Sequence, residues 1–172
     1  MIELRKEIEP QIDKAEEIYP RILKCLLDYT KYVDENGDEE NKEYQRVVAY
    51  LTQLTGKNIE ESDYAIWEYW EADGEHRESF KIALPHPMIV DNLTKEELTE
   101  IVFRITSMKL PEYLKTDFIE KNGFEWEICD YYHQLLKINF KKYNYRIFNR
   151  QKDANGEWYE PSTEEIVEKI GG

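Results

Sequence analysis

The sequence predicts a mainly helical α+β domain, a bundle of helices with a small antiparallel β-hairpin near the C-terminus. Apolar residues recur at spacings of three and four over long stretches, the period of a helix with one buried face. Two Ser/Thr-x-x-Glu sequences, at 94–97 and 162–165, have the composition of helix-capping boxes. Near the end of the chain, a turn sequence at 153–156 separates two short stretches rich in β-formers.

An N-terminal helical hairpin is expected over residues 1–56. Pro10 suits the start of its first helix, where a missing N–H costs nothing. Pro20 lies within the apolar stripe and predicts a kink or break, because its ring clashes with the carbonyl four residues earlier. The second helix is expected to end at Gly56. The stripe consists of Ile8, Ile12, Ala15, Tyr19, Ile22, Leu26, Tyr29 and Val33. Its spacing fits packing within the domain, which we favour, and also an oligomer formed through this helix.

Central helices are expected over residues 57–142. Within them, residues 62–84 have two interpretations. One is a β-hairpin that turns at Gly74; the other is two short helices that end near Gly74 and Leu84, and we favour the helices. The rest of the central region is clearer, because apolar residues keep a helical period there.

A helix is predicted to begin at Thr94, because the capping box precedes residues with helical apolar spacing. A short helix is predicted from Pro111 to Gly123, and a longer one from Phe124 to about Lys142. The first rests on Pro111 at its start and Gly123 at its end, and the second rests on the helical spacing of its apolar residues.

The C-terminal part, residues 143–172, is predicted to contain the hairpin and a last helix. Residues 143–148 alternate between apolar and polar like a half-buried strand, and residues 157–159 are expected to return beside it. The last helix follows Pro161. Together the three parts are expected to form a single globular domain over residues 1–172, a usual domain size.

Composition sets limits on function. The net charge is −14 and the isoelectric point is about 4.7, which disfavours nucleic acid as a partner and favours basic proteins. No apolar run approaches the roughly 20 residues of a membrane span, so no membrane association is expected. The charged opening segment has no signal-peptide pattern, and Cys25 and Cys129 lie in apolar helical patterns. We therefore expect a cytoplasmic protein with two buried thiols.

No residues are predicted to be catalytic, and no cofactor is predicted. The internal glycines are not clustered as a phosphate cradle requires, and none of the serines lies in a nucleophile elbow. Asp130 and His133 share one helix face with the spacing of carboxylate–histidine metal motifs, but a second such pair is missing. A metal site is therefore not assigned. A metal-binding protein or metal-assisted enzyme built on Asp130 and His133 remains an alternative hypothesis.

Charge is split between two aromatic-rich stretches. Residues 58–78 hold eight acids and one base, whereas residues 137–152 hold six bases and no acid. Aromatic side chains in a rim of carboxylates suit a contact with a Lys/Arg-rich partner, although the same aromatics also suit packing beneath neighbouring helices. The predicted partner-binding residues are Glu61, Asp63, Trp67, Glu68, Tyr69, Trp70 and Glu71.

The best hypothesis from the sequence is a small, acidic, non-catalytic interaction module that binds a basic partner. An immunity or antitoxin protein would fit this description, and so would a nucleic-acid mimic. A further alternative is an RNA-binding accessory that uses the basic segment 137–152, in which bases interleave with aromatic residues. The strand-like alternation of 143–148 also fits an ordinary half-buried strand.

Overall fold

The computed structural model describes residues 1–59, 64–71 and 73–171. Within them it holds seven α-helices, three 3-10 turns and one two-stranded antiparallel sheet near the C-terminus, which confirms the predicted fold class. The chain divides into two compact units. Unit 1 comprises Met1–Pro10 and His86–Gly172, and unit 2 comprises Gln11–Pro85. That the whole chain forms one domain stays a prediction.

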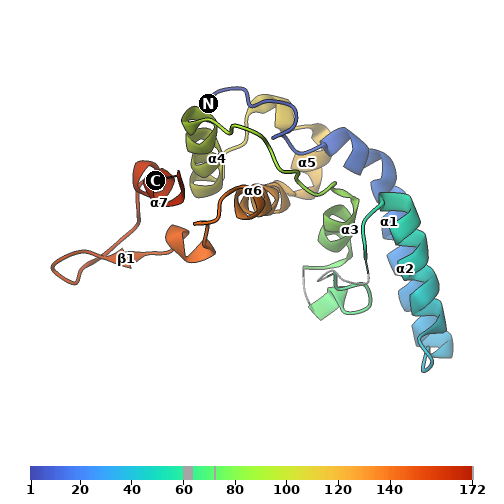
Figure 1. Ribbon diagram of the computed structural model, residues 1–172. Helices are drawn as coiled ribbons and strands as arrows, with labels where there is room; N and C mark the ends of the chain where they lie inside the picture. Colours follow the sequence, from blue (N-terminus) through green and yellow to red (C-terminus); the bar gives the residue numbers. More distant parts are fainter. Residues whose placement is uncertain (60–63, 72, 172) are drawn as a thin grey trace. The chain divides into compact units, whose positions relative to one another are not determined.

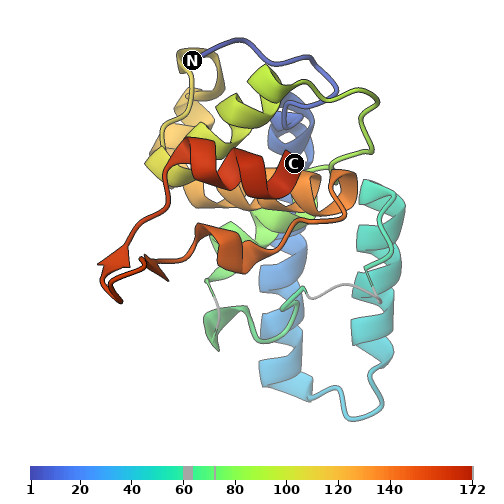
Figure 2. The same ribbon diagram turned by 60° about the vertical axis from the view of Figure 1, so that its left-hand side comes forward.

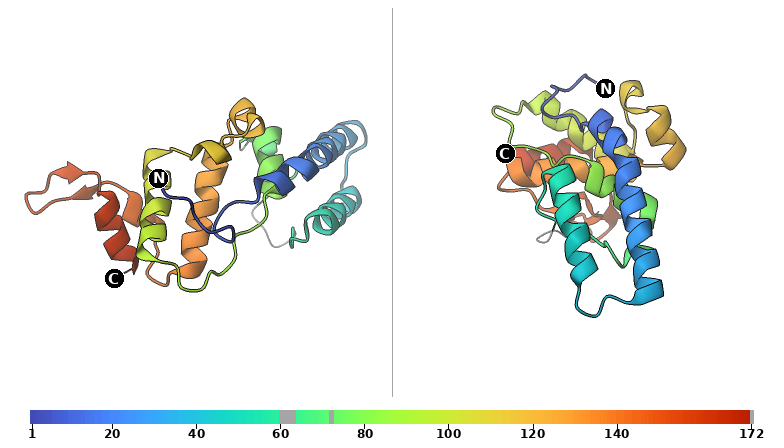
Figure 3. Two further views of the ribbon diagram at one scale, coloured as in Figure 1. Left: turned by 90° about the horizontal axis from the view of Figure 1, so that it is seen from above. Right: turned by 90° about the vertical axis from the view of Figure 1, so that its right-hand side faces the viewer.

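Unit 2 is built on a hairpin of two antiparallel helices that lie side by side (Figures 1 and 3). They are α1 (Ile12–Asn36) and α2 (Lys42–Thr55), and Gly56 ends α2 in the left-handed conformation as predicted. Of the kink or break predicted at Pro20, the break does not occur, because α1 continues through this residue. Buried apolar side chains before and after Pro20 hold α1 in place, which offsets the one backbone hydrogen bond that proline removes.

In the described residues, the middle of unit 2 forms an α-helix only in its second half. Helix α3 (Glu75–Ala83) follows Gly74 and packs against α1, so the favoured helix is confirmed there and the strand alternative is wrong. Phe80 and Ile82 are fully buried on α3. Of the expected first helix, the described residues 64–71 instead form turns that end in the 3-10 turn η1 (Tyr69–Glu71).

Within the described residues, unit 1 contains the other four α-helices and the hairpin (Figure 2). Helix α4 contacts both α6 and α7. The elements are α4 (Lys95–Ser107), η2 (Glu112–Leu114), α5 (Asp117–Asn122), α6 (Glu125–Asn139), η3 (Tyr145–Phe148), β1 (Gln151–Lys152), β2 (Trp158–Tyr159) and α7 (Thr163–Gly171). The helix predicted from 111 to 123 is split into η2 and α5, because the Thr116 side chain caps a new helix there.

Both predicted capping boxes are present in unit 1. The Thr94 hydroxyl accepts from the Glu97 backbone N–H at 3.2 Å, and the Glu97 carboxylate accepts from the Thr94 N–H at 2.9 Å. Ser162 and Glu165 form the same pair of hydrogen bonds at 3.3 and 2.8 Å. These local signals therefore fix the starts of α4 and α7.

The strand predicted over residues 143–148 is wrong. The Asn144 side chain accepts from the Arg146 N–H at 3.0 Å and turns the chain into η3. The sheet begins later, where Gln151 pairs with Tyr159 and Lys152 with Trp158. Figures 1 and 2 show this hairpin projecting away from α7. No helix in the described ranges is both long enough and apolar enough to cross a membrane.

Candidate functional site

The structure separates the aromatic residues of the predicted partner site. Trp67 is 52% exposed, whereas Tyr69 is buried and its hydroxyl lies 2.8 Å from the Thr30 hydroxyl of α1. Glu68 and Glu71 are exposed. The segment is thus attached to α1 through Tyr69 while it presents Trp67 and two carboxylates to solvent.

The remaining predicted site residues are described in part or not at all. Trp70 belongs to η1 between Tyr69 and Glu71. Glu61 and Asp63 lie outside the described residues. Their membership of the site stays a prediction.

Trp67 lies beside a pocket at the tip of the α1–α2 hairpin, a feature that the sequence did not indicate. The pocket has a volume of about 430 Å³, and the rings of Tyr29 and Tyr44 have their centroids 6.1 Å apart. Its lining consists of Tyr29, Val33, Asp38, Asn41, Tyr44, Gln45 and Trp67. The residues from α1 and α2 escaped prediction because they are more than 20 positions away from Trp67 in the sequence.

Asp38 gives this pocket a fixed negative charge. Its carboxylate accepts from the backbone N–H groups of Tyr44 at 2.8 Å and Glu43 at 3.1 Å. Desolvation raises the pKa of Asp38, but these backbone donors outweigh it and the net pKa is lowered. Asp38 therefore stays ionised at neutral pH beside two aromatic rings.

More carboxylates surround the tip. Asp34, Glu35, Glu39 and Glu40 are exposed on the loop and helix end that join α1 to α2. Lys31 approaches Glu35 at 3.9 Å, and Lys42 pairs with Glu40. Over its whole length, unit 2 carries 18 acids and 9 bases, a net charge of −9. We call Trp67, Glu68, Glu71, Asp38 and the four loop acids the acidic aromatic face.

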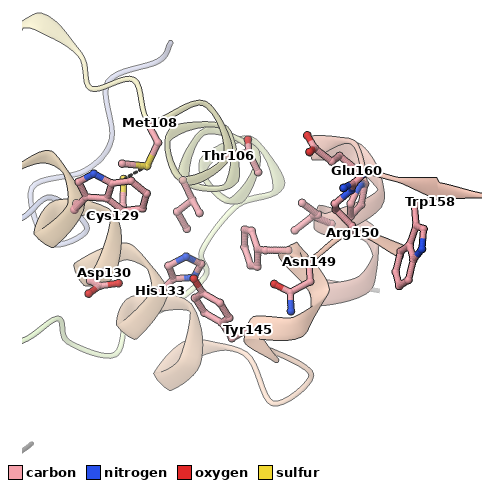
Figure 4. Close-up of a pocket in the computed structure, with 15 residues that line it drawn as sticks. Thr106, Met108, Cys129, Asp130, His133, Tyr145, Asn149, Arg150, Trp158 and Glu160 are labelled. Atoms are coloured by element: carbon pink, nitrogen blue, oxygen red, sulfur yellow. Dashed lines mark hydrogen bonds between the residues drawn. The ribbon is translucent and has the colours of Figure 1, made fainter. Parts of the chain in front are cut away.

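Unit 1 has a larger hollow of about 770 Å³ (Figure 4). Its walls come from α4, α6, η3, β2, the segment between β2 and α7, and α7 itself. In Figure 4, Cys129 and Met108 lie toward one end, His133 and Tyr145 in the middle, and Trp158 at the other end beside Arg150. The lining is Ile105, Thr106, Met108, Trp126, Cys129, Asp130, His133, Tyr145, Phe148, Asn149, Arg150, Trp158, Glu160, Pro161 and Ile166.

His133 is enclosed by aromatic rings within this hollow. Its Nδ1 lies 2.8 Å from the Tyr143 hydroxyl, and its ring centroid is 4.7 Å from that of Tyr145 and 4.8 Å from that of Phe148. Burial lowers the pKa of His133 to about 4, because the charged form is poorly solvated there. His133 is therefore neutral at physiological pH.

The structure brings the two residues of the metal hypothesis to the same hollow. Asp130 and His133 both line it. Among the described residues, however, no group of three or more His, Cys, Asp or Glu side chains is placed to hold a metal ion. The metal hypothesis thus has no complete ligand set in this part of the chain.

The two thiols differ in burial. Cys129 is buried and donates to Met108 Sδ at 3.5 Å (Figure 4), whereas Cys25 is only partly buried, which corrects the prediction of two buried thiols. Desolvation by burial raises the pKa of each to about 11. Both thiols are therefore protonated at neutral pH and are poor nucleophiles.

Sequence reasoning missed a buried arginine in unit 1. The Arg104 side chain is fully buried, and its Nη1 donates to both Glu9 carboxylate oxygens at 3.0 Å and to the Tyr132 hydroxyl at 2.5 Å. Its Nε donates to Glu100 Oε1 at 2.9 Å, and its Nη2 donates to the Tyr113 hydroxyl at 3.0 Å. Because this donor set is fully used in holding the fold together, we assign Arg104 a structural role.

Unit 2 has a buried lysine, Lys57, which is only 6% exposed. Its ammonium donates to the Tyr64 hydroxyl at 3.0 Å and to the Lys81 carbonyl at 2.9 Å. Burial lowers the pKa of Lys57 to about 7. Nearby, the buried Glu78 accepts from the Ala65 N–H at 2.9 Å, and burial raises the pKa of Glu78.

Comparison of the chain with protein-family models, with curated protein sequences and with solved structures finds no match. Function must therefore be inferred from the chain's own sites.

Proposed function

We propose that this protein is a small, acidic, non-catalytic interaction module that binds a basic protein through the acidic aromatic face of unit 2. The observation that carries the proposal is the position of Trp67. This half-exposed indole borders a pocket that also contains the ring of Tyr44 and the ionised carboxylate of Asp38. When a lysine or arginine side chain leaves water, cation–π contacts with aromatic faces and a charge-assisted hydrogen bond to a carboxylate can replace its hydration.

The surrounding charge supports the same kind of partner. The acids of the hairpin tip and of residues 68–71 lie on one unit whose net charge is −9. Such a field raises the association rate of a basic protein and falls off with salt. A central tryptophan within a polar rim is also the usual composition of an interface hot spot.

An immunity or antitoxin protein that blocks a basic toxin fits this proposal, and a nucleic-acid mimic fits it as well. In both cases carboxylates meet the Lys/Arg-rich surface of the partner. The nature of the captured partner distinguishes them, since a mimic binds a protein that otherwise binds nucleic acid. We place the interaction in the cytoplasm, where the free thiols of Cys25 and Cys129 stay reduced.

Charge reversal at Glu68 and Glu71 tests the proposal. The protein is immobilised and exposed to lysate of its source organism at low and then moderate salt, and retained proteins are identified by mass spectrometry. We expect wild type to retain a basic protein at low salt and release it as salt rises. The Glu68→Lys/Glu71→Lys variant should bind that protein about tenfold more weakly or not at all, because attraction becomes repulsion.

A matched control distinguishes an effect of the acidic aromatic face from an effect of the protein's net charge. Glu157 and Glu168 are exposed acids of unit 1, and Glu157→Lys/Glu168→Lys changes the net charge by the same amount. We expect this control to retain the partner like wild type. If all three proteins retain the same set, the face has no role and the proposal is wrong.

A further inference from the structure

The hollow of unit 1 has the features of a ligand site that is independent of the acidic aromatic face. Its volume of about 770 Å³ falls within the range of small-molecule sites, roughly 300–1,000 Å³. Its floor includes buried apolar side chains such as Ile166, and its rim carries polar groups such as Asn149. A hollow of this size that combines apolar side chains with polar groups able to orient a ligand is a usual setting for a bound small molecule.

Exposed aromatic rings are concentrated around this hollow. Trp126 is 61% exposed, Trp158 is 60% exposed and Tyr145 is 58% exposed, and all three line it. His133 is neutral and adds another aromatic ring to the wall. Large rings left in contact with water around one hollow suit a planar ligand, which would stack on them.

Two cations lie at the Trp158 end of the hollow, against the acidic trend of the chain. The six basic residues of segment 137–152 are all exposed, and in the described part of the chain none of them forms an ion pair. Arg150 lines the hollow, and Lys152 Nζ lies 5.1 Å from the centre of a Trp158 ring. These two cations therefore lie beside an exposed indole, where they can hold a phosphate.

Two carboxylates limit how an anion can lie in the hollow. Asp130 and Glu160 both line it, and Figure 4 shows Asp130 far from Arg150. Repulsion from Asp130 disfavours a long polyanion along the whole hollow. The same carboxylates are acceptors for the amino groups of a nucleobase. The arrangement thus suits one base inside and one phosphate at the Arg150 end.

We propose that this hollow binds a nucleotide, with its base stacked on Trp158 and its phosphate held by Arg150 and Lys152. The nucleotide is either free or the end of a single strand, because both present the same base and phosphate. Two residues of the basic segment, Arg150 and Lys152, then form the phosphate side of a ligand site within an otherwise acidic protein.

Binding is tested on the full-length chain with two probes, adenosine monophosphate and a single-stranded oligoadenylate of ten nucleotides. Saturable heat of binding in calorimetry is expected for at least one probe. Saturation by the oligonucleotide alone identifies a strand end as the source, and saturation by the monophosphate identifies a free nucleotide. No saturable binding of either probe at millimolar concentration overturns the proposal.

The affinities of substituted proteins for the same probes test whether binding takes place in the hollow. Arg150→Gln/Lys152→Gln and, separately, Trp158→Leu should each weaken binding about tenfold, because the first removes the phosphate contacts and the second the stacking platform. The matched control is Arg21→Gln/Lys24→Gln, an exposed Arg/Lys pair of unit 2. It should bind like wild type. Equal affinity of wild type and both hollow variants, with folding verified by circular dichroism, contradicts the proposal.

Discussion

Replacement of Arg104 by methionine is expected to lower the free energy of unfolding by about 3–5 kcal/mol, the usual cost of breaking a buried ion pair from one side. The variant leaves the carboxylates of Glu9 and Glu100 without their cation, at side-chain exposures of 13% and 7%. It also leaves the buried Tyr132 hydroxyl without its donor from Arg104. Methionine fills much of the volume but supplies no donor, so the loss is mainly electrostatic.

Urea unfolding followed by circular dichroism measures this effect. The control is Arg46→Met, because Arg46 is 79% exposed and its surface ion pair contributes little. We expect that control to lie within about 0.5 kcal/mol of wild type. Arg104→Lys should recover only part of the loss, since one ammonium cannot serve all partners of the guanidinium. A loss below about 1 kcal/mol for Arg104→Met would contradict the structural role that we assign to this side chain.

Replacement of Lys57 by methionine is expected to change how stability depends on pH. The pKa of Lys57 is about 7 in the folded protein and 10.5 for an unperturbed lysine, so between these values the unfolded chain binds more protons. Lys57 therefore makes the wild type less stable as pH falls from 10 to 7. The variant lacks this penalty. As pH falls from 10 to 7, the stability of the variant relative to wild type should therefore increase by about 3 kcal/mol, at roughly 1.4 kcal/mol per pKa unit.

Urea unfolding of both proteins at pH 7, 8, 9 and 10 gives this difference, in which the titration of all other groups cancels. Lys14→Met is the matched control, because Lys14 is an exposed lysine of the same unit. Its difference from wild type should not vary with pH. A difference for Lys57→Met that stays flat from pH 7 to 10 would show that the buried ammonium keeps its charge.

Local signals predicted much of the fold. The capping boxes at Thr94 and Ser162 were correct because all their hydrogen bonds join residues within three positions. The prediction of a strand at 143–148 was wrong because it relied on the alternation of apolar residues. It neglected a competing local signal, the Asn144 side chain that turns the backbone. A kink or a break was predicted at Pro20, and the break did not occur because the buried side chains of α1 keep the helix continuous there.

The candidate site could be predicted less well. Neighbouring aromatics must point in different directions, but the sequence does not show which one is buried. A hydrogen bond to Thr30, 39 positions away, decides that Tyr69 is buried and leaves Trp67 exposed. The pocket beside Trp67 likewise depends on α1 and α2 meeting in space. Similarly, Arg104 and Glu9 are 95 positions apart, so the helical spacing of apolar residues could not predict their contact.

The most direct test of the acidic aromatic face is photocrosslinking in the source organism. Trp67 is replaced by the photoreactive residue p-benzoylphenylalanine, and adducts formed under ultraviolet light are identified by mass spectrometry. The control carries the same residue in place of Ile89, which is 75% exposed in unit 1. We predict that one basic protein is crosslinked from position 67 and not from position 89. An absence of adducts at position 67, or the same adducts from both positions, would contradict the account.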